Sequence, residues 1–173
     1  MSEDLVKREI SGVAKSLRQT YLATEGNEKF VMKGDNLYKG NTMLSGNYKL
    51  VDQLKDEQDV EVSLFFGDVR EVTTLKDESG KREINTKMSS EVYDTLKKGE
   101  EYFATNVDVL GTDYYGYYVP VYQPGTKEFA GSVFCGRTQT QVTQSLRNTV
   151  ISMAAVMSVS YTHLRAHETR HDL

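Results

Sequence analysis

The pattern of apolar and polar positions predicts helices near both ends of the chain. Over residues 2–28, apolar side chains recur at steps of three and four residues, with Lys, Arg and Glu between them, as on an amphipathic helix. Residues 48–58 show a shorter version of this pattern. Ser89 or Ser90 can cap another short helix, and a further helix is expected from Gln139 onward.

Between these helices the periodicity changes to that of β-strands. The turn dipeptide Gly67-Asp68 separates two β-rich runs and predicts a hairpin. Residues 34–47 are rich in Gly and Asn and are interpreted as a loop with a short extended piece near Leu37. Strands are expected over residues 60–66, 69–75, 82–85, 102–110, 114–122 and 129–137. Short connections force successive strands to pair antiparallel, so the pattern predicts an α+β domain with about five antiparallel strands.

Composition narrows the class of protein. The chain has 173 residues, of which 27% are charged and 38% hydrophobic, and its net charge is -4, as in an ordinary soluble domain. Nucleic acid is not an expected partner, because clustered Lys and Arg are missing. The single cysteine, Cys135, excludes an internal disulfide and a multi-thiolate metal site, and its apolar neighbours indicate a buried core position.

The C-terminal tail carries a pattern typical of a metal site. His163, His167 and His171 recur every four residues, which would place three imidazoles on one helix face. However, residues 159–169 resemble the in-frame translation of a common sequencing adapter, so we interpret residues 159–173 as non-native. Without this tail the chain has no histidine for nucleophilic, acid–base or metal chemistry. We therefore expect no catalytic activity, no metal and no cofactor.

An apolar run at residues 150–158 ends where this tail begins. It is shorter than the ~18–20 residues of a membrane span, and no signal peptide is recognisable. We interpret the run as the first turns of a longer hydrophobic helix in the natural protein. One domain is thus expected over residues 1–158, with a core at 30–138 and an exit helix from residue 139 that leads to the membrane.

Several motifs resemble those of a known family. They are G-D-x-R at residues 67–70, KKGEEYF at 97–103, and DYYGYYVPVY at 113–122 followed by G-x-V-F-x-G. With the intervening sequence, about residues 60–137, they resemble the single Cache domains of bacterial methyl-accepting chemotaxis proteins. The resemblance implies a PAS-like ligand-binding sensor on the extracellular face of the cell membrane, anchored by spanning helices and joined to a cytoplasmic signalling region.

The resemblance does not identify the ligand. The amino-acid-binding motif of double Cache sensors (a Tyr, then Arg, Trp and Tyr, then Asp) is missing, and the chain has no Trp. We therefore expect a small carboxylate or a similar metabolite.

Side chains suited to a carboxylate occur in the sheet and before the inserted helix. Arg70 can make a bidentate contact and Lys87 can supply a point charge, while hydroxyl groups and an aromatic wall complete a pocket. The candidate ligand-binding residues are Phe65, Arg70, Thr86, Lys87, Tyr102, Tyr115 and Tyr117. Because strand side chains alternate, Tyr115 and Tyr117 share one face of their strand, and Tyr114 and Tyr118 share the other. Core packing for the tyrosines and solvation for the cations are the alternative roles.

The alternatives for function are a sensor, an enzyme and a structural domain. A sensor would bind a small molecule that favours one arrangement of the sheet and helices, and the apolar stripe of the N-terminal helix would form a homodimer. Its output could belong to a chemoreceptor, a histidine kinase or a cyclic-dinucleotide enzyme. A zinc hydrolase would depend on the tail histidines, and a structural surface domain would lack a pocket.

Overall fold

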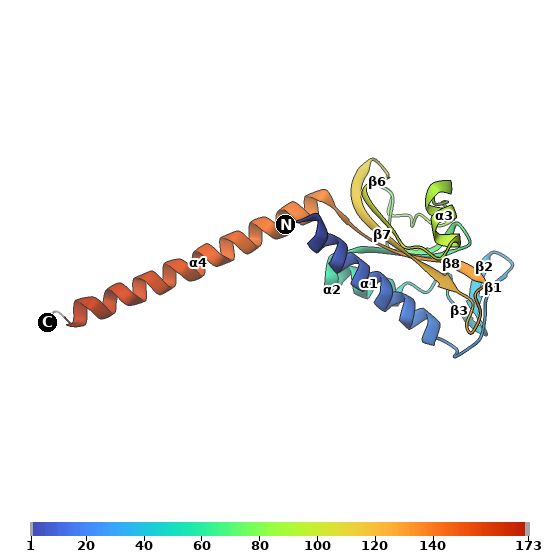
Figure 1. The fold of residues 1–173 in the computed structure, drawn as a ribbon, viewed down its shortest axis with the longest axis horizontal. Helices are drawn as coiled ribbons and strands as arrows, with labels where there is room; N and C mark the ends of the chain where they lie inside the picture. Colours follow the sequence, from blue (N-terminus) through green and yellow to red (C-terminus); the bar gives the residue numbers. More distant parts are fainter. Residues whose placement is uncertain (1, 172–173) are drawn as a thin grey trace. The chain divides into compact units, whose positions relative to one another are not determined.

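The structure, a computed structural model, describes residues 2–171, with side chains described as far as residue 159. The chain divides into two compact units, Ser2–Gln139 and the segment from Thr140 onward. The elements, in chain order, are α1 (Glu3–Ala23), β1 (Phe30–Lys33), β2 (Asn36–Lys39), β3 (Thr42–Met43), α2 (Lys49–Gln58), β4 (Glu61–Phe66), β5 (Val69–Thr73), α3 (Ser90–Lys97), β6 (Tyr102–Val109), β7 (Thr112–Tyr122), β8 (Phe129–Thr138) and α4 (Gln139–His171) (Figure 1).

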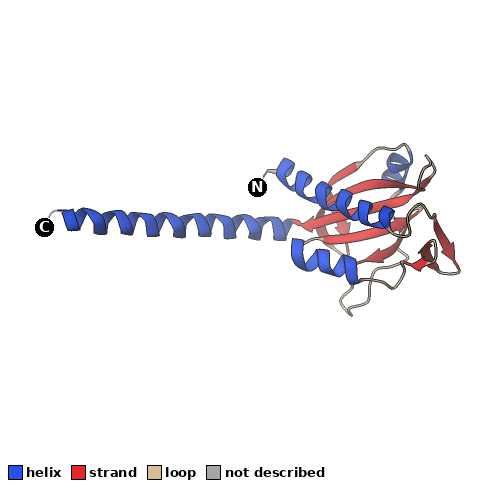
Figure 2. Cartoon of the chain, turned by 90° about the horizontal axis from the view of Figure 1, so that it is seen from below, coloured by secondary structure: helices blue, strands red, loops and turns tan. Residues whose placement is uncertain are grey.

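A five-stranded antiparallel sheet forms the centre of the first unit. Its strand order is β5-β4-β8-β7-β6, so the last strand in sequence pairs with the first strand of this sheet. The register places Val62 beside Cys135 and Phe65 beside Ser132. The predicted α+β class, with antiparallel strands between an N-terminal and a C-terminal helix, is confirmed (Figure 2).

Helix α1 covers one face of this sheet. Ser2 caps the helix, and its Oγ accepts a hydrogen bond from the Leu5 amide at 3.3 Å. The apolar stripe packs against β7 and β8. Its buried members are Val6, Ile10, Ala14, Leu17 and Tyr21. This stripe was our reason for expecting a dimer, but the chain's own sheet already buries it. Dimerisation through α1 would need the opposite side of the helix and stays a prediction.

Helix α1 ends earlier than predicted, and a buried side chain binds the carbonyl groups that follow its last residue. Lys39 is fully buried, and its ammonium donates to the carbonyl oxygens of Thr24 and Gly26. Glu25 and Gly26 both take left-handed backbone conformations, with φ of 53° and 58°. The helix therefore ends at Ala23 instead of continuing to residue 28.

The segment predicted as a loop, residues 34–47, contributes to a small three-stranded antiparallel sheet instead. β1, β2 and β3 pair in that order. Gly34 and Gly40, with φ of 62° and 57°, allow the tight turns between these strands. Leu37 is completely buried. The short extended piece expected near Leu37 is β2, but its pairing into a sheet was not predicted, because glycines that permit tight turns look, in sequence, like the glycines of an irregular loop.

Residues 82–85 do not form the predicted strand. Arg82 makes only an isolated bridge with Lys76. Its guanidinium binds both carboxylate oxygens of Asp52 at 2.7 Å and the carbonyl oxygen of Thr73 at 2.9 Å. The left-handed conformation of Asn85, with φ of 67°, then turns the chain toward β5. A side-chain anchor and a turn take the place of strand pairing.

Helix α3 packs against β6 and β7 on the sheet face opposite α1 (Figure 1). Ser89 is its N-cap, as the sequence suggested, and its Oγ accepts from the amide of Val92 at 3.3 Å. The helix is followed by Gly99 at φ 85°. The sheet thus separates two layers, and the pocket described below lies on the α3 side.

Helix α4 begins at Gln139, where the exit helix was predicted. In the part of the chain that the structure describes, no helix combines the length and hydropathy of a membrane span. The side chains of His163, His167 and His171 lie outside the described residues, so the metal alternative at the tail is not tested.

Candidate functional site

A pocket of about 430 Å³ opens on the α3 side of the sheet. Its walls come from the start of β5, the segment 83–89, the first turn of α3 and strand β6. Its volume lies in the range of small-molecule sites. Four of the seven predicted ligand-binding residues line it, namely Arg70, Thr86, Lys87 and Tyr102.

Arg70 is the buried cation of this pocket. Only 8% of the residue is exposed, and its guanidinium carbon lies 4.8 Å from the centre of the Phe65 ring. Its Nε donates to Ser63 Oγ at 3.1 Å, and its Nη1 donates to Thr86 Oγ1 at 2.5 Å. An aromatic support and two hydrogen bonds thus fix the guanidinium in one orientation.

Among the described residues, no carboxylate forms a salt bridge with Arg70. Burial lowers the pKa of Arg70 from its usual value, while electrostatic interactions with Tyr118 and the nearby charge of Glu83 oppose this change. A buried cation normally has an anionic partner, because desolvation is costly without one. This guanidinium is therefore suited to an anion that enters the pocket from outside.

The backbone of segment 83–89 is tied to β5, which explains why its side chains face Arg70. The Arg70 amide donates to the Thr86 carbonyl at 2.8 Å, and the Asn85 amide donates to the Arg70 carbonyl at 2.7 Å. Lys87 forms a bridge with Val69, and the Met88 amide donates to the Asp68 carbonyl at 3.0 Å. The predicted pair Thr86 and Lys87 thus reaches the pocket through main-chain pairing.

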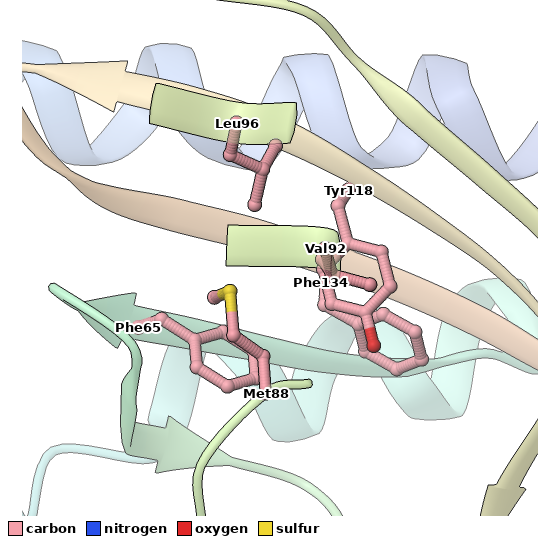
Figure 3. Packing of buried hydrophobic residues seen from close by; sticks show 6 residues of the cluster. All are labelled: Phe65, Met88, Val92, Leu96, Tyr118 and Phe134. Atoms are coloured by element: carbon pink, nitrogen blue, oxygen red, sulfur yellow. The ribbon is translucent and has the colours of Figure 1, made fainter. Parts of the chain in front are cut away.

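The base of the pocket is apolar. We expected Phe65 to form a wall of the pocket. Instead it is a buried support beneath Arg70, in one cluster with Met88, Val92 and Tyr118. Figure 3 shows Met88 beside the Phe65 ring and the rings of Tyr118 and Phe134 next to each other. The Tyr118 and Phe134 ring centres are 4.9 Å apart. Such a base excludes water from beneath the guanidinium and strengthens its attraction for an anion.

Strand β6 supplies the outer wall. Tyr102 packs edge-on against Tyr118, with ring centres 6.2 Å apart. Farther along the strand, Ala104 and Val107 line the pocket on either side of an irregularity in the pairing with β7. Leu110, at the hairpin turn, completes the rim. The pocket therefore combines apolar walls with a few polar groups, the composition expected of a ligand site.

The structure does not bring Tyr115 and Tyr117 to this pocket. The alternation along β7 was correct, but the pocket contains Tyr118, on the opposite face of the strand. The Tyr117 hydroxyl donates to Glu101, which pairs with Lys15 of α1 at 3.5 Å. Tyr117 therefore faces α1, and no ligand contact is proposed for either tyrosine.

Several pocket residues were missed by sequence reasoning. They are Glu83, Met88, Ser89, Val92, Ala104, Asn106, Val107, Asp108, Val109, Leu110 and Tyr118. One signal could have identified the correct face of β7. Gly116 shares the face of Tyr118, and a Cβ atom there would lie 2.8 Å from Cε2 of Phe134. A glycine in the middle of an aromatic strand marks the close approach of another ring.

The other chemistry of the described residues is limited. No group of three His, Cys, Asp or Glu side chains among them could hold a metal ion. Cys135 is completely buried, as predicted, and burial raises the pKa of its thiol. A buried thiol with a raised pKa is a poor nucleophile. The arrangement in the pocket is suited to binding an anion.

The sequence model of the family described as single Cache domain 3 matches residues 41–149. The chain belongs to this family. The match extends beyond residues 60–137, where the motifs that suggested the resemblance lie, and includes α2, α3 and the whole five-stranded sheet.

A solved structure supports the same fold for this Cache domain. The crystal structure of the E. coli DcuS sensor domain matches with a TM-score of 0.54 at 17% sequence identity, over 83% of this chain and 96% of that chain. No curated protein has a sequence that matches this chain. The Cache family and the PAS-like fold together identify a sensor domain.

Proposed function

We propose that this Cache domain is the extracellular ligand-binding part of a membrane-anchored receptor and that it binds a small carboxylate through Arg70. The observation that carries the proposal is a buried guanidinium that lines a pocket of about 430 Å³ and forms no salt bridge with a described residue. A carboxylate would accept charge-assisted hydrogen bonds from it, and these are roughly twice as strong as neutral ones.

The neighbouring groups complete the proposed binding site. Lys87 adds a second positive charge at the pocket, and Thr86 holds the guanidinium with a hydrogen bond from Nη1. Tyr102 carries a hydroxyl group on the outer wall, and Tyr118 lies at the base. The apolar surface of Met88 and Val92 would contact the hydrocarbon part of the ligand.

Thermal unfolding of the chain with a panel of short carboxylic acids tests the proposal. A ligand at 100 times its dissociation constant adds about 2.7 kcal/mol, or roughly 5–10 °C for a domain of this size. Arg70→Gln should weaken binding by roughly tenfold to a hundredfold. Arg8→Gln, at an exposed arginine of α1, is the matched control and should keep the affinity. Equal binding by the Arg70 variant would refute the assignment.

We propose a chemoreceptor as the full-length protein, on the resemblance of its motifs to methyl-accepting chemotaxis proteins. The run at residues 150–158 would then continue into a spanning helix, and residues 159–173 would not be native. The natural gene tests this proposal. We expect more than about ten further apolar residues after Met157, followed by a methyl-accepting signalling region. A kinase or cyclic-dinucleotide region there would assign a different output, and a polar continuation would contradict the membrane anchor.

A further inference from the structure

The charges that line the pocket are unequal in burial and mixed in sign. Arg70 is 8% exposed, whereas Lys87 is an exposed residue. Two acidic residues, Glu83 and Asp108, line the same pocket. A single carboxylate can use the buried cation. A second carboxylate on the same ligand would meet acidic groups and one solvated lysine, whose attraction is weak because water screens it.

Glu83 is held close to Arg70 by a chain of hydrogen bonds. Arg70 Nη1 donates to Thr86 Oγ1 at 2.5 Å, and the same hydroxyl donates to the Glu83 carbonyl oxygen at 3.1 Å. The Glu83 amide in turn donates to the Leu75 carbonyl at 3.0 Å. The backbone of Glu83 is thus fixed on both sides, one hydroxyl group away from the guanidinium.

The carboxylate of Glu83 has no other described role. It makes no salt bridge or hydrogen bond with a described residue, although its charge opposes the lowering of the Arg70 pKa by burial. Asp108 differs, because its Oδ1 accepts a hydrogen bond from the Gly111 amide at 2.9 Å and so supports the β6–β7 turn. Asp108 keeps its negative charge, but it is exposed to water, which screens it, whereas Glu83 is half-buried. Glu83 is therefore the acidic residue of this pocket whose charge should act most strongly on a ligand.

We propose that Glu83 makes the pocket selective for acids with a single carboxylate and excludes dicarboxylates. The inference rests on the proposed function, since it assigns a subclass of ligand to the same site. A monocarboxylate places its charge on Arg70 and its hydrocarbon chain against Met88, Val92 and Tyr118. A dicarboxylate places a second negative charge near Glu83, and like charges separated by several ångströms repel in a partly desolvated site.

Matched acids of equal length provide the test. We would measure the dissociation constants of the full chain for propionate and malonate, butyrate and succinate, and valerate and glutarate by calorimetry at low salt. Each pair has the same number of carbons and differs by one carboxylate. The best monocarboxylate should bind at least about tenfold more tightly than its partner, a difference of about 1.4 kcal/mol. 4-Aminobutyrate, which carries a positive group instead, should bind more tightly than succinate.

Glu83→Gln removes the proposed repulsion and keeps the shape of the side chain. In this variant succinate affinity should rise by about tenfold and butyrate affinity by no more than about threefold. The preference for butyrate over succinate should therefore become much smaller. Glu78→Gln is the control, because Glu78 is exposed in the turn before this segment and does not line the pocket. It should leave the preference unchanged.

The outcomes separate this inference from the proposed function. Succinate binding as tightly as butyrate, or a preference that survives Glu83→Gln, would overturn the role of Glu83 while leaving a carboxylate sensor. Absence of binding by every acid in the panel would overturn both proposals. A preference for monocarboxylates that disappears in the Glu83 variant alone would support both.

Discussion

The guanidinium carbon of Arg70 lies 4.8 Å from the centre of the Phe65 ring, and the two residues are partners on the neighbouring strands β5 and β4. The register shifts between Leu64 and Phe65, and this irregularity sets Arg70 opposite Phe65. The ring supports the flat face of the cation, while Ser63 and Thr86 hold two of its edges. The orientation of the anion-binding group therefore depends on a residue that does not itself line the pocket.

Replacing Phe65 with leucine should weaken carboxylate binding although Phe65 does not line the pocket. Leucine keeps an apolar core but loses the cation–π contact, which is worth about 0.5–2 kcal/mol in proteins. We expect a roughly threefold to tenfold increase in the dissociation constant of the bound acid. Calorimetry well below the midpoint of thermal unfolding measures this change on folded protein.

Phe103→Leu is the matched control for this prediction. Phe103 is also a strand phenylalanine with a cation above its ring, because Lys7 Nζ lies 5.4 Å from its centre. It pairs with Tyr117 on the α1 side of the sheet, away from the pocket. This variant should keep the affinity of the unmodified chain. An equal loss in both variants would mean that general loosening of the sheet, and not the support of Arg70, explains the effect.

Tyr117→Phe should leave ligand affinity unchanged within about twofold. The Tyr117 hydroxyl faces Glu101 and α1, so its removal takes nothing from the pocket. Loss of this partly buried hydrogen bond should lower the free energy of unfolding by about 0.5–1.5 kcal/mol. Calorimetry and urea unfolding check the two expectations separately. A marked loss of affinity with normal folding would return Tyr117 to the binding site.

The same tyrosine should contribute to the pH dependence of stability. Burial, then the hydrogen bond and the charge of Glu101, raise the pKa of Tyr117 to about 12. Its ordinary value in an unfolded chain is about 10. As pH rises between these values, the unfolded state loses the phenolic proton first, so stability falls. Below about pH 10 the contribution of Tyr117 to the free energy of unfolding is fully present.

Urea unfolding at about pH 9 and about pH 11 isolates this effect when the unmodified chain is compared with Tyr117→Phe. Other tyrosines titrate in both proteins, so the informative quantity is the difference between the two declines. The phenylalanine variant should lose less stability over this interval. Identical declines would show that Tyr117 titrates alike in the folded and unfolded states.

The sequence predicted the elements of this domain better than their pairing. Periodicity located α1 and the hairpin of β4 and β5, because local residues determine both. It could not show that β8 would pair with β4, since that contact joins residues as distant as Val62 and Cys135. The small sheet of β1, β2 and β3 was missed because its glycine turns also suit an irregular loop.

The candidate site was predicted as far as local pattern allowed. Arg70, Thr86 and Lys87 were found because they flank recognisable elements, and the structure brings them to one pocket. Alternation assigns the tyrosines of β7 to two faces of the strand, but it does not show which of the two faces lines the pocket. Only the position of α3 over β6 and β7 shows that Tyr118, and not Tyr117, faces the pocket.

Two glycine substitutions should change stability in opposite directions. A Cβ atom at Gly136 would lie 2.6 Å from Cζ of Phe134 and 3.1 Å from the Tyr115 carbonyl oxygen. Gly136→Ala should therefore displace the Phe134 ring from beneath Tyr118 and lower the free energy of unfolding by about 1–3 kcal/mol.

Gly12 lies within α1, and a Cβ atom there would meet no neighbouring atom within 4 Å. Gly12→Ala should raise stability by about 0.5–1 kcal/mol.

Thermal unfolding of both variants checks the pair. A Gly136→Ala variant as stable as the unmodified chain would mean that the Phe134 ring can move without loss. Ligand binding by the Gly136→Ala variant should also be measured, because Tyr118 packs on the Phe134 ring with ring centres 4.9 Å apart. We expect this variant to bind more weakly, since the base of its pocket is displaced.

Lys39→Met should destabilise the domain without affecting the ligand. The buried ammonium binds the carbonyl oxygens of Thr24 and Gly26, which follow the last residue of α1. Methionine has a similar volume but no donor, so both carbonyl groups would lose a charge-assisted partner. We expect a loss of about 1–3 kcal/mol in the free energy of unfolding. Lys127→Met, at an exposed lysine between β7 and β8, is the control and should have little effect. Because Lys39 lies in the small sheet and does not line the pocket, carboxylate affinity should stay within about twofold. A fall in affinity beyond this, with the domain still folded, would mean that the end of α1 and the pocket are energetically coupled.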